Sequence, residues 1–394
     1  MSSGTPGVFI VAASRTPIGA FQGGLSEVSA PKLGAVAIRA ALAASGLNAA
    51  DVQETYMGNV LTAGIGQAPA RQAARAAGIP DSVPATTVGK VCGSGLQAVV
   101  LGAKSILLGD ANVVLAGGME SMSQAPYLLP QGRAGFRMGH AKVIDSMIHD
   151  GLWDPYNDYH MGIAGELCAK EHNFTREAQD AFAVSSYQKA IAAQESKAFA
   201  NEIAAVTIEG KTPVVISEDE EPKRVKFDKM PSLRPAFDKA GTITAANASK
   251  IDDGAAALIL ASGNTVESRG LKPLARIVSY GAHAQAPEWF TTAPIGAIRA
   301  ACARANLEVS DIDLFEINEA FAVVAMVAAR DLNIPAEKLN VRGGAIALGH
   351  PIGASGARVL TTLVHSLIAL NKRRGLATLC IGGGEALAVI VERV

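Results

Sequence analysis

Along residues 8–120, short runs of β-branched and other apolar residues alternate with longer alanine-rich stretches. The runs VFIVAAS, ETYMGNVL and NVVLAGG have the length and composition of buried strands, and APKLGAVAIRAALAASG and GLQAVVLGAKSILLGD between them are long enough for helices. The helical stretch 31–44 has Pro31 near its start and Gly46 just after it, which are typical helix start and stop signals. This alternation predicts βαβ units around a parallel sheet.

The same alternation returns from about residue 273, so the chain contains two similar halves. Its 394 residues exceed the roughly 250 to 300 at which one hydrophobic core stops growing, which also predicts more than one domain. Charge, glycine and proline concentrate between the halves, which is typical of loops that carry function. We expect an N-terminal half at 1–120 and 250–272, an inserted loop domain over the active site at 121–249, and a C-terminal half at 273–394.

Composition limits the classes of function. A formal net charge of −1 without long basic runs gives no electrostatic footprint for nucleic acid. The N-terminus lacks targeting features, and no apolar run reaches the roughly 18 residues of a membrane span, so we expect a soluble cytoplasmic protein without membrane contacts. The four cysteines form neither a disulfide framework nor a C-x-x-C zinc pair, and no metal site is expected.

Cys92 stands in VGKVCGSGLQAVVLGAK, between a strand-like run and a helical one. A thiol near a helix N-terminus is stabilised as the thiolate, so we expect its pKa to fall below the usual value of about 8.5. Two other interpretations remain. GSGLQA imitates part of a dinucleotide-binding fingerprint, and a free cysteine is more often a packing residue than a nucleophile.

A second stretch, GAIALGHPIGASGAR, nearly spells a phosphate-binding loop, but His350 stands where the lysine would be. A single histidine is usually structural. Because only glycine and proline flank it, we expect an exposed and positioned imidazole.

Two further motifs lie in the C-terminal half. LFEINEAFAVV leads into an apolar helix, where Asn318 could simply be the N-cap. TLCIGGGEAL places Cys380 before Gly382 and two more glycines. Glycines let main-chain N–H groups approach a ligand closely, so these amides could bind an oxyanion beside a thiol that moves protons.

Two cysteines, a GHP histidine and NEAFA in this order resemble the thiolase family, and within it the acetyl-CoA C-acetyltransferases, also called acetoacetyl-CoA thiolases. The resemblance runs from end to end through RTPIGAF, VCGSGLQAV, AGGMESMS, YHMG, GTITAANAS, DDGAAALIL, NEAFA, GGAIALGHPIGASGAR and GLATLCIGGG. It implies an α/β thiolase fold in which two related βαβ-rich halves form a five-layered αβαβα arrangement with an inserted loop domain. It also implies a homotetramer, a dimer of dimers, that acts on acetyl-CoA and CoA.

By this resemblance, Cys92 would take the acyl group, His350 would activate it, and Cys380 would remove the α-proton of a second acetyl-CoA. Asn318 would hold a water that stabilises the enolate with His350. The N–H groups of Cys92 and Gly382 would form an oxyanion hole. A Claisen condensation needs a nucleophile, a carbon base and two oxyanion sites, which agrees with this set. The alternatives are a degradative 3-ketoacyl-CoA thiolase of broader chain length and a non-catalytic acyl-CoA or lipid carrier.

The resemblance also implies substrate contacts and reveals three departures. The implied CoA and acyl contacts are Ser249, Ala245, Phe237, His160, Met161, Arg224, Phe321 and Phe290. For Arg224 a solvated surface charge is the simpler interpretation. No cofactor is implied, because CoA thioesters are substrates. Pro222 replaces the tyrosine of potassium-responsive relatives and argues against potassium, Gly89 replaces Asn or Ser, and Phe290 with Thr291 resembles the mitochondrial relatives.

Overall fold

The computed structural model describes residues 7–394, so residues 1–6 of the predicted N-terminal half lie outside it. One ten-stranded sheet runs through the described part of the chain. Its strands, in spatial order, are β14 (Leu314–Ile317), β15 (Arg374–Ile381), β16 (Glu385–Arg393), β13 (Ala275–Ala284), β1 (Val8–Arg15), β12 (Asp252–Ser262), β5 (Val113–Ser121), β3 (Glu54–Gly58) and β4 (Ala85–Val88), with β2 (Gly19–Ala20) beside β12. The two halves of this row meet in its middle, where β1 pairs with β13 over three residues, Val8 to Ile10.

The sheet is mixed, so the prediction of a parallel sheet is confirmed only in part. β3 pairs in parallel with β4 and β5, and β14 with β15, but β12 runs antiparallel to both β1 and β5. A short turn joins β15 to β16, and two strands joined so closely can pair only as antiparallel neighbours. β12 follows a long insertion rather than a crossover helix, so the rhythm of the sequence did not reveal its direction.

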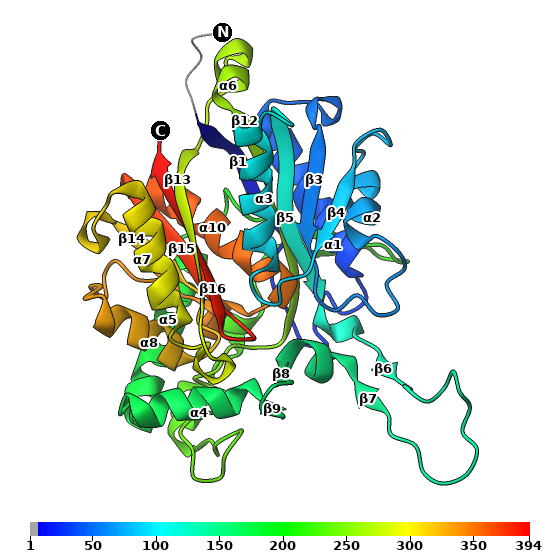
Figure 1. Ribbon diagram of the computed structural model, residues 1–394, viewed down its shortest axis with the longest axis vertical. Helices are drawn as coiled ribbons and strands as arrows, with labels where there is room; N and C mark the ends of the chain where they lie inside the picture. Colours follow the sequence, from blue (N-terminus) through cyan, green and yellow to red (C-terminus); the bar gives the residue numbers. More distant parts are fainter. Residues whose placement is uncertain (1–6) are drawn as a thin grey trace.

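Helices form three layers around the two parts of the sheet (Figure 1). α1 (Ala30–Ser45) and α2 (Pro69–Ala76) cover one outer face, and α7 (Ala293–Ala305) with α8 (Ala322–Asp331) the other. α3 (Ser94–Leu108) and α10 (Ile352–Ala369) pack together in the middle, where α10 contacts both β5 and β15. Alternate residues of β15 belong to different cores, with Leu379 facing the central helices and Cys380 the layer of α7 and α8. The result is a five-layered αβαβα arrangement.

The expected end signals of the first long helix are present. α1 contains Pro31 in its first turn, and Gly46 closes it with φ 72, a left-handed conformation that glycine adopts without strain.

The two central helices correct another expectation. Val91–Leu108 and Ile352–Ala369 are long and apolar enough, by length and composition alone, to cross a membrane. Within the molecule 67% and 83% of these windows are buried, and helices enclosed between two sheets need apolar residues on all sides. Their composition is therefore explained by the core.

The segment between β5 and β12 contains most of the irregular structure. Its helices are α4 (Met161–Glu171) and α5 (Arg176–Glu195), and its short strand pairs are β6 (Tyr127–Leu128) with β7 (Ile144–Asp145), β8 (Trp153–Asp154) with β9 (Tyr159–His160), and β10 (Val206–Ile208) with β11 (Val214–Ile216). The arm that carries β6 and β7 extends away from the body (Figure 1). Two short α-helices lie elsewhere, α6 (Gly263–Arg269) and α9 (Ala345–Leu348). Single helical turns complete the chain: η1 (Ala49–Asp51), η2 (Met122–Gln124), η3 (Met147–Leu152), η4 (Glu221–Arg224), η5 (Phe227–Ser232), η6 (Pro287–Trp289) and η7 (Val309–Asp311).

Candidate active site

Cys92 lies in a tight turn immediately before α3. Val91 adopts φ 43, a left-handed conformation that is unusual for a β-branched residue. The turn is closed by hydrogen bonds from Gly93 N to Lys90 O and from Lys90 N to the Ser94 hydroxyl. Strained backbone of this kind persists only where its surroundings hold it, and it often marks a functional site.

The Cys92 thiol is buried, and burial raises its pKa to about 11. The main-chain N–H groups of Gly382 and of Cys92 itself bond to the sulfur and oppose this rise, but they do not outweigh the loss of solvation. The predicted lowering of the pKa was therefore wrong. In the resting enzyme the sulfur is a neutral thiol with two N–H groups directed at it.

Cys380 is fully buried near the end of β15 and lies close to the first thiol. Burial raises its pKa well above the usual value, and the neighbouring Cys92 contributes to the rise. The glycines after it form the turn to β16, where Gly383 has φ 90 and Gly384 φ 86. A Cβ on Gly384 would lie 2.2 Å from Gln285 O, so both conformation and space require glycine there.

His350 precedes α10, and its position follows from the packing of the two central helices. A Cβ on Gly95 of α3 would lie 2.8 Å from Ala357 N and 3.1 Å from Gly353 O, so the first turns of α3 and α10 are in close contact. The residues just before these turns, Cys92 and His350, are thereby brought to the same end of the central layer.

The imidazole of His350 is buried, which corrects the expectation of an exposed side chain. Burial lowers its pKa to about 3, and the positive charge of Arg358 acts in the same direction. Its main-chain N–H donates to Asp252 Oδ2 at 2.8 Å. The ring is therefore neutral at physiological pH and its backbone is fixed.

Ser355 determines which ring nitrogen carries the proton. Its Oγ lies 2.6 Å from His350 Nδ1 and 2.9 Å from Pro351 O. If the hydroxyl proton pointed to the imidazole, two oxygen atoms would face each other at 2.9 Å with no proton between them. The hydroxyl therefore donates to Pro351 O and accepts from Nδ1–H, which leaves His350 Nε2 with a free lone pair.

Asn318 follows β14 and lies beside this histidine. Its Nδ2 is 3.5 Å from both ring nitrogens of His350, and its main-chain N–H donates to Thr378 O. Its Oδ1 is buried and has no protein partner in the described part of the chain. Because α8 begins only at Ala322, Asn318 is not its N-cap. An unpaired buried carbonyl oxygen is a hydrogen-bond acceptor available to a bound water or ligand.

The neighbouring Glu319 is structural. It accepts hydrogen bonds from Ser186 Oγ, Asn340 Nδ2 and Ile346 N, and it is fully enclosed.

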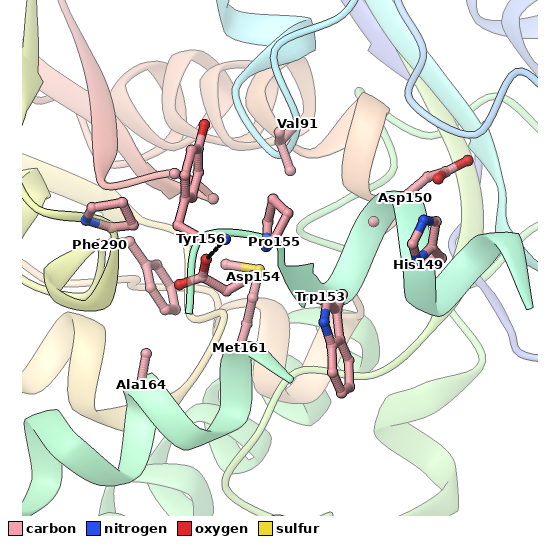
Figure 2. Close-up of a pocket in the computed structure, with 14 residues that line it drawn as sticks. Val91, His149, Asp150, Trp153, Asp154, Pro155, Tyr156, Met161, Ala164 and Phe290 are labelled. Carbon is pink, nitrogen blue, oxygen red and sulfur yellow. Dashed lines mark hydrogen bonds between the residues drawn. The ribbon is translucent and has the colours of Figure 1, made fainter. Parts of the chain in front are cut away.

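A cavity of about 160 Å³ opens beside Gly382 (Figure 2). Met161 and Phe290, both predicted from the sequence, line it together with Tyr156 and Trp153, which the sequence did not single out. A Cβ on Gly382 would lie 3.4 Å from the side chain of Met161, so Met161 packs against the glycine turn that follows Cys380. The missed aromatic residues belong to the loop WDPYNDYHMG, whose last four residues were recognised while the preceding ones were not.

Four predicted aromatic side chains contact one another in a row that starts at Phe290 in the cavity lining. His160 stacks on Phe237 with ring centroids 4.6 Å apart, Phe237 meets Phe321 edge-on at 5.9 Å, and Phe321 meets Phe290 at 6.4 Å. These contacts join the loop before α4, the segment before the 244–249 turn and the start of α8. This row of rings is thus assembled from segments far apart in the sequence.

The predicted CoA contacts Ala245 and Ser249 lie in the turn 244–249. Ala245 is exposed, and Ser249 N donates to Ala320 O. Arg224 is about half exposed and lies 3.5 Å from Glu221. Lys250, which the sequence reasoning missed, donates to the carbonyls of Ala245 and Ala248. Arg224 and Lys250 both act on the charge of Glu221, so Arg224 lies in the surroundings of this turn.

The three positions at which the sequence departs from the predicted family pattern, Gly89, Pro222 and Thr291, have different surroundings. Gly89 is exposed and nothing lies within 4 Å of the position of a Cβ, so a side chain would fit there. Pro222 is buried in η4. Thr291 is completely buried, and its hydroxyl has no hydrogen-bond partner in the described part of the chain.

Comparisons with known proteins point to one family over nearly the whole chain. Residues 8–264 match the family described as thiolase, N-terminal domain, and residues 271–393 match thiolase, C-terminal domain. Proteins named acetyl-CoA acetyltransferase from Cupriavidus necator and Pseudomonas aeruginosa are 52% and 51% identical over 389 residues, which is 98% of this chain and 99% of each relative.

A solved structure of a thiolase is also similar to this chain. The crystal structure of Acat5 thiolase from Ascaris suum in complex with coenzyme A superimposes with a TM-score of 0.94 at 44% identity, over 98% of this chain and all of that one. The expected thiolase fold is confirmed, and the chain belongs to the thiolase family.

Proposed function

We propose that the protein is an acetyl-CoA C-acetyltransferase that condenses two acetyl-CoA into acetoacetyl-CoA and CoA, reversibly, through an acetyl-cysteine. The observation that supports this proposal is that two buried thiols lie close together beside the Gly382 N–H, which borders a cavity, while His350 lies at the same end of the central layer. The names of relatives about half identical over nearly the full chain support the same reaction.

In the first half-reaction, Cys92 Sγ attacks the thioester carbonyl of acetyl-CoA while His350 Nε2 accepts the thiol proton. The carbonyl oxygen gains negative charge and is stabilised by the N–H groups of Cys92 and Gly382, which already converge on the sulfur. The bond to the CoA sulfur then breaks, and CoA leaves as the thiol with the proton from His350. The acetyl group remains on Cys92.

In the second half-reaction, His350 Nε2 takes the proton of the Cys380 thiol, and the Cys380 thiolate removes an α-proton from a second acetyl-CoA. The resulting enolate oxygen is stabilised by the protonated His350 and by a water held at the unpaired Asn318 Oδ1. The enolate carbon attacks the acetyl group on Cys92, the bond to Cys92 Sγ breaks, and this sulfur leaves as the thiol with the proton from His350. Glycine turns and buried surroundings exclude solvent from the enolate, which would otherwise be protonated by water.

The cavity suits a short acyl group. Met161 and Phe290 border it, and a row of ring contacts continues from Phe290 to Phe321, Phe237 and His160. We assign the pantetheine of CoA to Ala245 and Ser249, and a CoA phosphate to Arg224. A degradative 3-ketoacyl-CoA thiolase would need room for longer chains, and rates of thiolysis across a chain-length series distinguish the two activities.

The assembly and conditions of action are part of the proposal. We infer a cytoplasmic homotetramer, and the exposed Tyr127, Leu129, Phe136 and Met138 of the protruding arm support contacts between subunits. We expect no metal, no organic cofactor and no nucleic acid or membrane partner. Sedimentation of the purified protein tests the oligomeric state.

The test of the reaction separates the two thiols. Intact-protein mass is measured after incubation with acetyl-CoA, beside a condensation assay. We expect Cys92→Ala to remain unacetylated and inactive, and Cys380→Ser to become acetylated while condensation falls about 10²- to 10⁴-fold, the usual contribution of a general base. Full condensation by Cys380→Ser, or acetylation that survives in Cys92→Ala, would show that the assigned roles are wrong.

A further inference from the structure

Lys250 is a partly buried lysine whose ammonium turns back onto the main chain just before it. Its Nζ donates to Ala245 O at 2.6 Å and to Ala248 O at 2.9 Å. Both carbonyls belong to the turn 244–249. Hydrogen bonds from a charged donor are shorter and stronger than neutral ones, so one ammonium fixes two peptide planes of the same turn.

The remaining polar groups of this turn are also engaged. Thr244 N donates to Asn247 Oδ1, and Thr244 O accepts from the N–H groups of Asn247 and Ala248. Ala322 N donates to Asn247 O, and Ser249 N donates to Ala320 O, which ties the turn to the segment after Asn318. The carbonyls of residues 245 and 248 depend on Lys250 instead.

Several negative charges surround the ammonium. Burial lowers the pKa of Lys250 to about 8, and the charges of Glu221, Asp252 and Glu319 oppose this lowering. Burial, together with the same three carboxylates, raises the pKa of the Tyr187 hydroxyl. The Tyr187 ring lies 5.6 Å from Lys250 Nζ, in the arrangement of a cation–π contact. Without the ammonium, the carbonyl oxygens of Ala245 and Ala248 would lose their donor, and the positive charge on which the three carboxylates act would be missing. Oxygen ligands in a negative potential are the environment that binds a hard monovalent cation.

We propose that the Lys250 ammonium is a tethered cation that holds the 244–249 turn in the shape that receives the pantetheine of CoA. Lys250 acts through Ala245 and Ala248 and touches no reacting atom, so it is a positioning residue. The inference rests on the proposed function, because it takes CoA to be the ligand of this turn.

The experiment measures the dissociation constant of free CoA by titration calorimetry, which requires no turnover. Lys250→Ala is compared with the wild type in choline, sodium, potassium, ammonium and methylammonium chloride at one ionic strength. Lys189→Ala is the matched control, because Lys189 Nζ also donates to two main-chain carbonyls, at 3.3 and 2.9 Å, but in the segment 336–339 away from the turn. Lys250→Met keeps the length of the side chain without its charge.

We expect Lys250→Ala to bind CoA about 10- to 100-fold more weakly in choline, as the loss of two charged hydrogen bonds predicts. Ammonium, methylammonium or potassium should restore much of the affinity, and should have little effect on the wild type or on Lys189→Ala. Lys250→Met should be weak in every salt, since its methyl group fills the space, and it provides the comparison if Lys250→Ala does not fold.

CoA affinity within twofold of the wild type in Lys250→Ala or Lys250→Met would overturn the inference. Weak binding by Lys250→Ala that no cation improves would overturn the tethered-cation role. If the wild-type protein does not bind CoA, the proposed function fails, and this is seen before any variant is compared.

Discussion

Replacing Ser355 by alanine tests whether the tautomer of His350 controls the chemistry. The substitution removes the hydroxyl that lies 2.6 Å from Nδ1 and changes little else on the side chain. Nδ1–H then loses its acceptor inside a fully buried site, and the alternative tautomer, with the proton on Nε2, is no longer disfavoured. In that tautomer the ring cannot accept the thiol proton of Cys92.

The size of the effect follows from the cost of an unpaired buried donor, about 1 to 3 kcal/mol. At about 1.4 kcal/mol for each factor of ten, kcat should fall about 5- to 140-fold. The KM for acetoacetyl-CoA should stay within about twofold, because the Ser355 hydroxyl bonds to His350 and Pro351 rather than to the turn 244–249, to which we assign CoA, and the lost interaction matters in the transition state. Steady-state thiolysis and single-turnover acetylation of Cys92 measure the two quantities.

Ser366→Ala is the matched control for this prediction. Ser366 is buried on the same helix, and its hydroxyl has no hydrogen-bond partner within residues 7–394. Its replacement should leave kcat within about twofold. The reasoning is refuted if Ser355→Ala retains wild-type kcat, or if Ser366→Ala loses as much activity with the same change in melting temperature.

Three other outcomes are expected. Gly384→Ala should destabilise the fold by about 1 to 3 kcal/mol or more, because of its φ of 86 and the 2.2 Å approach to Gln285 O; a denaturant midpoint unchanged from the wild type would contradict this. Alkylation of Cys92 by iodoacetamide, followed by peptide mass, should accelerate steadily between pH 7 and pH 9, because the thiol with its pKa raised to about 11 ionises only above this range. A plateau with its midpoint near pH 7 would show a lowered pKa. Phe290 and Thr291 should allow thiolysis of 2-methylacetoacetyl-CoA at a rate comparable to acetoacetyl-CoA, and undetectable turnover of the methyl compound would exclude this specificity.

The sequence was sufficient to predict elements and motifs that depend only on residues next to one another in the chain. Pro31 and Gly46 mark the ends of α1, because proline restricts the backbone conformations at its own position and glycine allows the left-handed one. The chemical residues were likewise readable, since a thiol, an imidazole and a glycine turn are recognisable by type and order. Cys92, Cys380, His350 and Asn318 were all predicted in this way. In the structure Cys380 lies near Cys92, and Asn318 lies 3.5 Å from His350.

The missed site residues have no such local signal. Ser355 looks like an ordinary helical serine, and only its distance to His350 Nδ1 reveals its effect on the tautomer. Lys250 looks like a surface lysine after a small-residue turn, and only the folded turn shows its ammonium between two carbonyls.

Tertiary structure alone decided the direction of the central strands and the charge state of the site. β12 reaches its place between β1 and β5 after the long insertion, so its antiparallel direction depends on how the whole chain folds. The helix N-terminus favoured a thiolate at Cys92 and the glycines around His350 favoured exposure, yet both side chains are buried and their pKa values shift toward the neutral forms. Solvation of a side chain is set by every element that packs around it, and most of those elements are distant in the sequence.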